Sequence, residues 1–275
     1  MFQKEYIKIY EKELTGLFGA MDAPNTKGKK MRAAGIDLRS IKMKNPIQSL
    51  SEKEWAIWIG SLLIVTISNM VSGDLDFLTL LAALIGVTSL IFAAKGNVWA
   101  QVLMVVFSIL YGIISWRFRY WGEMFTYLGM TMPMAIWSTI TWVKNPSKEN
   151  GNVVAIQKLN GKHIVALFFS CLVVTIGFYF LLRIMNTPNI IFSTISITTS
   201  FLAAELTMLR SSYYALGYAS NDIVLIILWI LASKENPIYI PVVVNFTIFF
   251  FNDMYGFFSW KKREKNVFKK VQFNS

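Results

Sequence analysis

Residues 245–260, "NFTIFFFNDMYGFFSW", place three polar side chains inside an aromatic and aliphatic run, and the basic run "KKREK" follows directly at 261–265. An apolar stretch that ends at a cluster of Lys and Arg predicts a helix that crosses a membrane and stops at its surface. An Asn or Asp side chain in hydrocarbon is costly unless it has a polar partner. Asn245, Asn252 and Asp253 are therefore expected to face another part of the protein.

The composition of the whole chain agrees with an integral membrane protein. Of its 275 residues, 55% are hydrophobic and only 16% are charged, whereas soluble domains carry about a quarter charged residues. The mean hydropathy is +0.47. The net charge of +11 does not indicate nucleic-acid binding, because the basic residues lie at the chain ends and between apolar runs, where lipid headgroups and the positive-inside rule place them.

Apolar segments of spanning length follow one another from residue 54 onward. The sequence predicts an all-α polytopic membrane protein with eight transmembrane helices, at 54–72, 75–94, 97–117, 121–143, 163–185, 189–209, 213–233 and 236–260. Residues 1–53 instead alternate apolar and charged positions at helical spacing and end in a basic linker. They are predicted to form a cytoplasmic segment with an amphipathic helix that lies on a membrane or on the protein.

The charges between the segments orient the chain. One side receives the N-terminal segment, Lys95, the loop 144–162, Arg210 and the basic tail 263–275. The other side receives most of the acids that lie between segments, although Arg117, Arg119 and Arg183 are exceptions. The positive-inside rule then places both termini in the cytoplasm, which fits an even number of spans.

Two segments end in the same way, which suggests an internal repeat. Segment four ends with Trp137, four residues, Trp142 and a basic position shortly after, and segment eight ends with Tyr255, four residues, Trp260 and Lys261. Membrane transporters are often built from such repeats, with the substrate bound between the halves near the midplane. Segments 2–4 and 6–8 are therefore predicted to be two parallel three-helix repeats, joined by segment five in a 3+1+3 order.

The polar residues inside the spans are the candidate site. Asn245 and Asn252 share a helical stripe in segment eight, with Asp253 and Tyr255 beside it. Segment seven carries a second group, and segments three and four a third; together these are Tyr218, Asn221, Asp222, Trp229, Gln101, Tyr127 and Trp137. Carboxamides offer donors and acceptors, and aromatic faces stack on flat rings, more strongly on cationic ones. A cavity of this kind suits a small, flat, polar solute that carries hydroxyls.

Structural roles compete with this interpretation. The asparagines can join helices by hydrogen bonds, and Asp222 and Asp253 can form ion pairs with Arg210 or Lys261. No Ser-His-Asp set, paired-acid hydrolase pattern or P-loop is visible, and the single cysteine, Cys171, allows no intramolecular disulfide. The sequence therefore predicts no enzyme, no catalytic residue, no cofactor and no metal site.

Two stretches resemble the PnuC family of bacterial nicotinamide riboside transporters: "RSSYYALGYASNDIVLIILWILAS" at 210–233 and "VVVNFTIFFFNDMYGFFSW" at 242–260. "KGNVWAQVLMVVFSILYGIISW" at 95–116 resembles the matching part of the first repeat. The resemblance covers about 75–262 and leaves the span 54–72 outside this seven-helix core. It implies a substrate bound by Asn221 and Asn252, and less directly by Asp222, Trp229, Asn245, Asp253 and Tyr255. Some relatives carry a Trp-x-x-Trp pair where this chain has Tyr214 and Gly217.

The resemblance implies a carrier of the bacterial inner membrane that imports nicotinamide riboside by facilitated diffusion. A cytoplasmic riboside kinase would trap the substrate, and a homotrimer follows by analogy. Asn221 and Asn252 are expected on the amide and ribose hydroxyls, with Trp229 or Tyr255 against the pyridinium ring. The alternatives are a carrier of another vitamin or nucleoside such as thiamine, an ion-coupled symporter that uses Asp222 or Asp253, and a membrane enzyme or non-transporting receptor.

Overall fold

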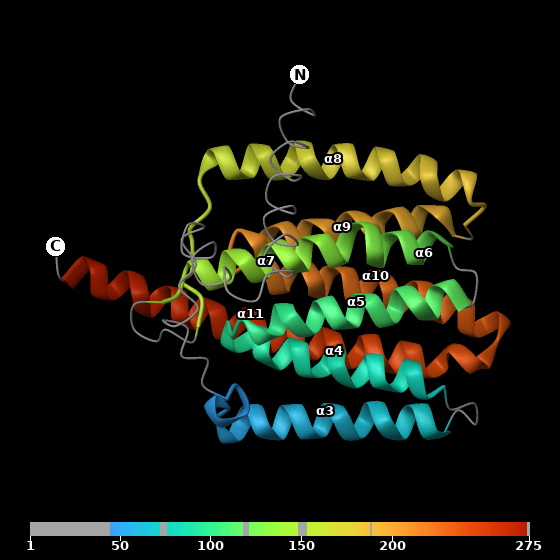
Figure 1. Ribbon diagram of the computed structural model, residues 1–275, viewed down its shortest axis with the longest axis horizontal. Helices are drawn as coiled ribbons and strands as arrows, with labels where there is room; N and C mark the ends of the chain where they lie inside the picture. The colour runs from blue at the N-terminus through green and yellow to red at the C-terminus, as the bar shows by residue number, and fades with distance from the viewer. Residues whose placement is uncertain (1–44, 72–75, 118–120, 148–152, 188, 274–275) are drawn as a thin grey trace, which may run out of the picture. The chain divides into compact units, whose positions relative to one another are not determined.

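The computed structural model describes residues 45–71, 76–117, 121–147, 153–187 and 189–273. The amphipathic helix and basic linker predicted for the N-terminal segment therefore lie almost entirely outside the described residues. The described elements (Figure 1) are η1 (Ile47–Ser49), α3 (Glu52–Val71), α4 (Phe77–Lys95), α5 (Trp99–Arg117), α6 (Trp121–Phe125), the π-helical turn η2 (Thr126–Thr131), α7 (Met132–Lys144), α8 (Gly161–Ile184), α9 (Ile190–Met208), α10 (Tyr214–Glu235), η3 (Pro237–Tyr239) and α11 (Ile240–Phe273).

The predicted spans are confirmed as helices. Seven helices in the described part of the chain are long and apolar enough to cross a membrane: α3, α4, α5, α8, α9, α10 and α11 together with η3. The segment predicted at 121–143 is not one regular helix, because η2 separates α6 from α7. A π-helical turn inside an α-helix is often found at a functional site, and this one proves to line a cavity.

The last helix is longer than predicted. α11 runs from Ile240 to Phe273 without a break, so the tail predicted as a separate segment at 263–275 continues the helix over most of its length. Arg263 fixes this extension by donating to the carbonyl oxygens of Lys95 and Val154, each at 2.8 Å.

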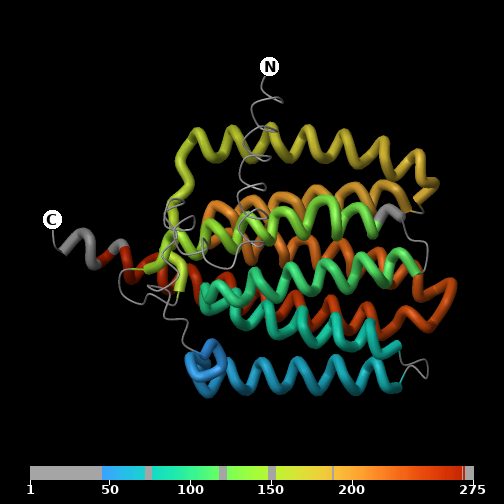
Figure 2. The backbone as a smooth tube through the Cα atoms, viewed as in Figure 1, coloured from blue at the N-terminus to red at the C-terminus, as the bar shows by residue number. Residues whose placement is uncertain are grey.

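Six of the described helices pack in a closed ring, in the order α4, α5, α7, α9, α10, α11 and back to α4. Figure 2 views the bundle from the side, with α8 at its upper edge and α3 at its lower edge. The three helices α4, α5 and α6–α7 are neighbours, as are α9, α10 and α11. The ring closes where the first helix of each group meets the last helix of the other. α8 packs outside α9, and α3 packs outside α4 and α11. The predicted 3+1+3 order, with α8 as the linker, is confirmed.

The first helix of each repeat ends in the same way. Gly96 follows α4 with φ 74°, and Arg210 follows α9 with φ 55°. The Gly96 amide donates to the Ala93 carbonyl at 2.8 Å, and the Arg210 amide donates to the Thr207 carbonyl at 2.9 Å. A left-handed residue after the helix is a common way to satisfy the last carbonyls. The two repeats therefore share a local feature that spacing alone did not predict.

The two tryptophans that suggested the repeat make reciprocal contacts between the halves. The Trp142 indole at the end of α7 donates to the Thr207 carbonyl of α9 at 2.9 Å. The Trp260 indole of α11 donates to the Ala93 carbonyl of α4 at 2.8 Å. The two rings lie 5.6 Å apart. Each repeat thus caps the first helix of the other, and both side chains are buried.

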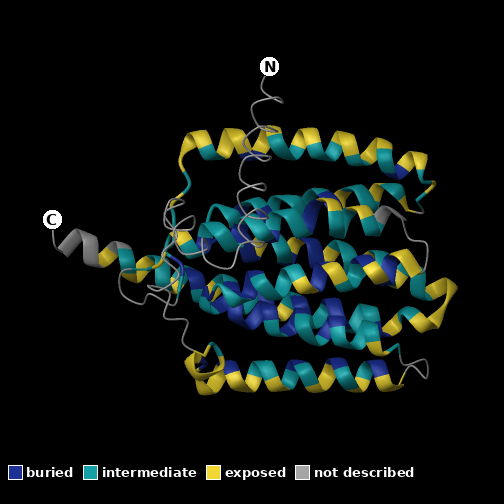
Figure 3. Cartoon of the chain, viewed as in Figure 1, coloured by how far each residue is buried: buried dark blue, intermediate teal, exposed yellow. Residues whose placement is uncertain are grey.

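Burial separates the ring from the outer helices (Figure 3). α4 is the most buried of the seven candidate spans, whereas α8 buries only Leu167 and Leu182. The exposed side chains of α8 include Phe168, Phe169 and Val173. Such an apolar surface fits a helix that faces lipid, because hydrocarbon does not penalise it.

Candidate functional site

A cavity of about 420 Å³ lies inside the described helix bundle. It extends from the middle of α10 to the loops that join α8 to α9 and α10 to α11. Its described lining residues come from both repeats and from the end of α8: Tyr111, Glu123, Thr126, Tyr127, Thr131, Leu182, Met185, Asn186, Thr187, Asn189, Ser193, Ser196, Ile197, Ser200, Asn221, Leu225, Leu228, Trp229, Ala232, Glu235, Tyr239 and Phe246. Its volume falls within the roughly 300–1,000 Å³ that is usual for small-molecule sites.

Asn221 is the predicted carboxamide that the structure places at the cavity. Its Oδ1 atom accepts hydrogen bonds from the Ser196 hydroxyl at 3.1 Å and from the Thr199 hydroxyl at 2.9 Å. Both hydrogen bonds use the oxygen, so the two Nδ2 donors are the part of the amide available to a ligand. The hydroxyl groups of α9 therefore fix which way the amide points.

Two aromatic pairs border the cavity. The Tyr111 ring of α5 lies 4.9 Å from the Tyr127 ring of η2, and Phe107 packs against Tyr111 at 4.6 Å. Trp229 of α10 lies 5.4 Å from Tyr239 of η3. Tyr127 and Trp229 were predicted site residues, and both line the cavity. These pairs offer flat apolar faces to a ring of similar size.

The charged side chains among the described lining residues are all acidic. Glu123 lies in the first turn of α6 and is half-buried, whereas Glu235 lies at the end of α10 and is exposed. None of the described lining residues is Lys, Arg or His. The cavity therefore favours neutral or cationic solutes over anions.

The two asparagines of the quoted stretch face α3 rather than the cavity. Asn252 Nδ2 donates to the Ser61 hydroxyl at 2.9 Å, and Asn69 Nδ2 donates to Asn245 Oδ1 at 3.3 Å. All four side chains are buried, and none of them lines the cavity. This arrangement matches the alternative in which the asparagines join helices.

Tyr255 also contacts α3. Its hydroxyl donates to Glu54 Oε1 at 3.2 Å, and the other carboxylate oxygen of Glu54 pairs with Lys95 at 2.9 Å. The contacts of Asn245, Asn252 and Tyr255 therefore form a polar ladder along the interface of α3 and α11. The helix outside the resemblance is thus bound to the last helix of the second repeat.

Asp222 of α10 and Asp253 of α11 are neighbours. Both side chains are buried, and they are close enough to interact electrostatically. The predicted ion pairs are wrong, because Arg210 bonds the Ala155 carbonyl and the Gln157 side chain, and Lys261 pairs with Glu264.

The remaining predicted site residues, Gln101, Trp137 and Tyr218, do not line the cavity. Gly217 packs so closely on α9 that a Cβ atom there would lie 2.9 Å from the Ala203 Cα atom. The backbone cannot move aside as a side chain can. Position 217, where some relatives carry the second Trp of the pair, therefore has no room for a Trp here.

Sequence reasoning missed the α9 wall of the cavity. The signal for the α9 wall was present as "STISITTS" at 193–200, a run of hydroxyl side chains in an otherwise apolar segment. Ser193, Ser196 and Ser200 line the cavity, and Thr199 holds Asn221. Hydroxyls are common in membrane helices because they bond their own backbone, so the run did not stand out.

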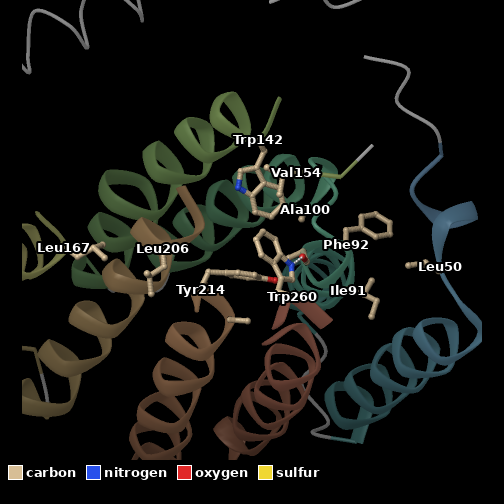
Figure 4. Close-up of a cluster of buried hydrophobic side chains, with 12 residues drawn as sticks. Leu50, Ile91, Phe92, Ala100, Trp142, Val154, Leu167, Leu206, Tyr214 and Trp260 are labelled. Carbon is tan, nitrogen blue, oxygen red and sulfur yellow. Dashed lines mark hydrogen bonds between the residues drawn. The ribbon is translucent and has the colours of Figure 1, made fainter. Parts of the chain in front are cut away.

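The bundle is packed shut beyond the inner end of the cavity. Trp142, Trp260 and Tyr214 meet there with small residues such as Ala215 in a buried cluster (Figure 4). The Tyr214 and Trp260 rings lie 4.8 Å apart. A solute in the cavity therefore has access to one end of the bundle and not to the other.

No group of three or more metal-ligating side chains occurs among the described residues. The chemistry of the lining, with three side-chain amides, several hydroxyls and aromatic rings, is that of a binding site for an organic solute.

Comparisons with known proteins agree with this architecture. The family model described as "Nicotinamide mononucleotide transporter" matches residues 76–262, which is more than half of the chain and leaves α3 outside the match. A nicotinamide riboside transporter PnuC from Haemophilus influenzae is 22% identical over 212 residues, covering 77% of this chain and 91% of the relative. A protein of the same name from Neisseria mucosa is 23% identical, covering 76% and 81%.

The fold also matches a solved structure. The crystal structure of the vitamin B3 transporter PnuC aligns with a TM-score of 0.67 at 20% identity, over 79% of this chain and 94% of the other. The ring of two three-helix repeats is thus a known transporter fold. The chain belongs to the nicotinamide mononucleotide transporter family, and it is a multi-pass membrane transporter rather than an enzyme.

Proposed function

We propose that the chain carries nicotinamide riboside across the bacterial inner membrane by facilitated diffusion. The supporting observation is the chemistry of the cavity: one oriented amide, two aromatic pairs and no basic residue among its described lining. Nicotinamide riboside is a flat cation with a carboxamide and ribose hydroxyls, so each of its groups has a counterpart there. The names of the two curated relatives support the same substrate.

The same observation separates the riboside from the mononucleotide that the family description names. A phosphate group is recognised by Arg, Lys or clustered backbone amides, and the described lining offers Glu123 and Glu235 instead. We therefore expect the mononucleotide to bind much more weakly. This difference also makes trapping effective, because phosphorylation by a cytoplasmic riboside kinase would turn the substrate into a form that the carrier rejects.

Asn221 and the aromatic pairs are the proposed contacts. The Nδ2 donors of Asn221 suit the carbonyl or hydroxyl oxygens of the substrate. Trp229 or the Tyr111–Tyr127 pair would lie against the pyridinium ring. Asn252 and Tyr255 are left out of this set, because their side chains bond α3.

The orientation follows from the positions of the charges. Lys95, Lys144, Arg210 and the basic end of α11 lie at one end of the helices, and the cavity reaches the other end. With the basic end in the cytoplasm, both termini are cytoplasmic and the cavity opens to the outside. Transport then requires the buried cluster around Trp142 and Trp260 to open while the outer end closes, by rocking of the repeats. We also propose a homotrimer, by analogy with the family alone.

A proton-coupled carrier is the second candidate, and the two neighbouring buried carboxyl groups of Asp222 and Asp253 are the observation that favours it. Buried carboxyl groups can bind and release a proton as a bundle opens and closes. Passive transport remains the first choice, because neither carboxyl lines the cavity.

Uptake into liposomes tests the proposal. Purified protein is reconstituted, and uptake of labelled riboside, mononucleotide, thiamine and riboflavin is measured with and without an enclosed riboside kinase and ATP. Of the four compounds, we expect only the riboside to enter the liposomes. Without the kinase it should reach equal concentrations inside and outside, and with the kinase and ATP enclosed it should accumulate inside. Uptake of thiamine alone would reject the substrate, and uptake that needs a proton gradient would favour the second candidate. Saturable binding without flux would reject transport.

A further inference from the structure

Glu123 is the less exposed of the two acidic residues in the described lining of the cavity. It lies in the first turn of α6, directly before the π-helical turn that carries Tyr127. Glu123 lies four residues before Tyr127, about one helical turn away, and Glu123, Tyr111 and Tyr127 all line the same cavity. Glu123 therefore lies in the same part of the cavity lining as the aromatic pair, whose rings lie 4.9 Å apart.

The surroundings of Glu123 increase the effect of its charge. Phe107 packs behind the pair, at 4.6 Å from Tyr111 and 6.0 Å from Tyr127, so the two phenol rings have an apolar ring behind them. Charges interact more strongly where water is partly excluded. No basic side chain in the described lining neutralises the carboxylate.

We propose that Glu123 is the charge-selecting residue of the site: its carboxylate favours a flat cationic ring held at Tyr111 and Tyr127 over a neutral ring of the same shape. Phenol faces attract a cation weakly by themselves. The negative charge of the Glu123 carboxylate adds a charge–charge attraction to the cationic ring. This inference rests on the proposed function and assigns the discrimination within that site to one side chain.

Glu235 provides a matched control in the same cavity. It has the same side chain and also borders the cavity, but it is exposed at the end of α10. An exposed charge is screened by water and salt. Glu235 is therefore expected to contribute little to the choice between a cation and a neutral analogue.

The test compares two ligands that differ mainly in charge. Nicotinamide riboside carries a pyridinium, and benzamide riboside replaces it with a neutral benzene ring. Dissociation constants are measured by tryptophan fluorescence with the full chain in detergent, for the wild type, Glu123→Gln and Glu235→Gln. We expect Glu123→Gln to reduce the preference for the cation by about tenfold or more, and Glu235→Gln to leave it unchanged.

The outcomes separate this inference from the proposed function. Wild-type protein that does not bind the riboside would overturn the proposed function and the inference with it. Wild-type binding with the same preference in Glu123→Gln would overturn the inference alone. If Glu123→Gln does not fold, Glu123→Asp keeps the negative charge and must keep the preference for the cation; its loss would overturn the inference as well.

Discussion

The polar ladder between α3 and α11 gives the sharpest prediction, because it decides what Asn252 does. Asn252→Ala removes the hydrogen bond from Nδ2 to Ser61, 2.9 Å long, and the bond to the Ile248 carbonyl, 2.8 Å long. A hydrogen bond between membrane helices contributes about 0.6 kcal/mol on average and up to about 1.7 kcal/mol. The substitution also leaves a small void between the helices.

Part of this loss is offset. The Oδ1 atom of Asn252 is buried without a hydrogen-bond partner among the described residues, and its removal relieves that cost. We therefore expect Asn252→Ala to lower the free energy of unfolding by about 0.5–2 kcal/mol, with the affinity for nicotinamide riboside unchanged.

A double-mutant cycle with Ser61→Ala isolates the contact. Unfolding of the single and double variants is followed in mixed micelles, and riboside binding is measured on the same samples. The coupling between the two positions should be about 0.6 kcal/mol. A tenfold weaker binding of the riboside to Asn252→Ala, with unfolding unaffected and no coupling to Ser61, would refute the reasoning and restore Asn252 to the binding site.

Three further predictions test the site and the packing. Asn221→Ala should weaken riboside binding by about tenfold, the value of one lost hydrogen bond, and an unchanged dissociation constant would remove Asn221 from the site. Asp253→Asn should leave riboside uptake into liposomes unchanged at pH 6 and pH 8, whereas loss of a pH-dependent component present in the wild type would indicate proton coupling. Gly217→Ala should lower the free energy of unfolding by about 1–3 kcal/mol, because the added Cβ meets the backbone of α9. Gly177→Ala in α8, where nothing lies within 4 Å of the added atom, should be neutral or stabilising; equal losses at both glycines would contradict the close packing.

Most of the fold could be predicted from the sequence. A membrane span must satisfy its backbone internally and present about 20 apolar residues, so the helices and their approximate ends follow from hydropathy. The repeat was indicated by two segments with the same ending, in which Trp137 and Trp142 have the same spacing as Tyr255 and Trp260. The π-helical turn at Thr126–Thr131 was not foreseen, since its residues fit an ordinary helix equally well.

The candidate site was predicted only in part. Asn221, Trp229 and Tyr127 line the cavity, whereas Asn245 and Asn252 bond α3. All of these are polar or amphipathic side chains on a helical stripe within an apolar segment. Periodicity shows that such a stripe faces protein, but it is the same whether the neighbour is a cavity or another helix.

The sequence by itself determined the membrane class, the spans, the repeat and the family resemblance, because each depends on local composition or spacing. The tertiary structure alone decided which helices are neighbours. It placed α3 against Asn245, Asn252 and Tyr255, and it brought Asp222 close to Asp253. A polar group buried in a membrane protein must find a partner, and only the packing of the helices shows whether that partner is another side chain or a substrate.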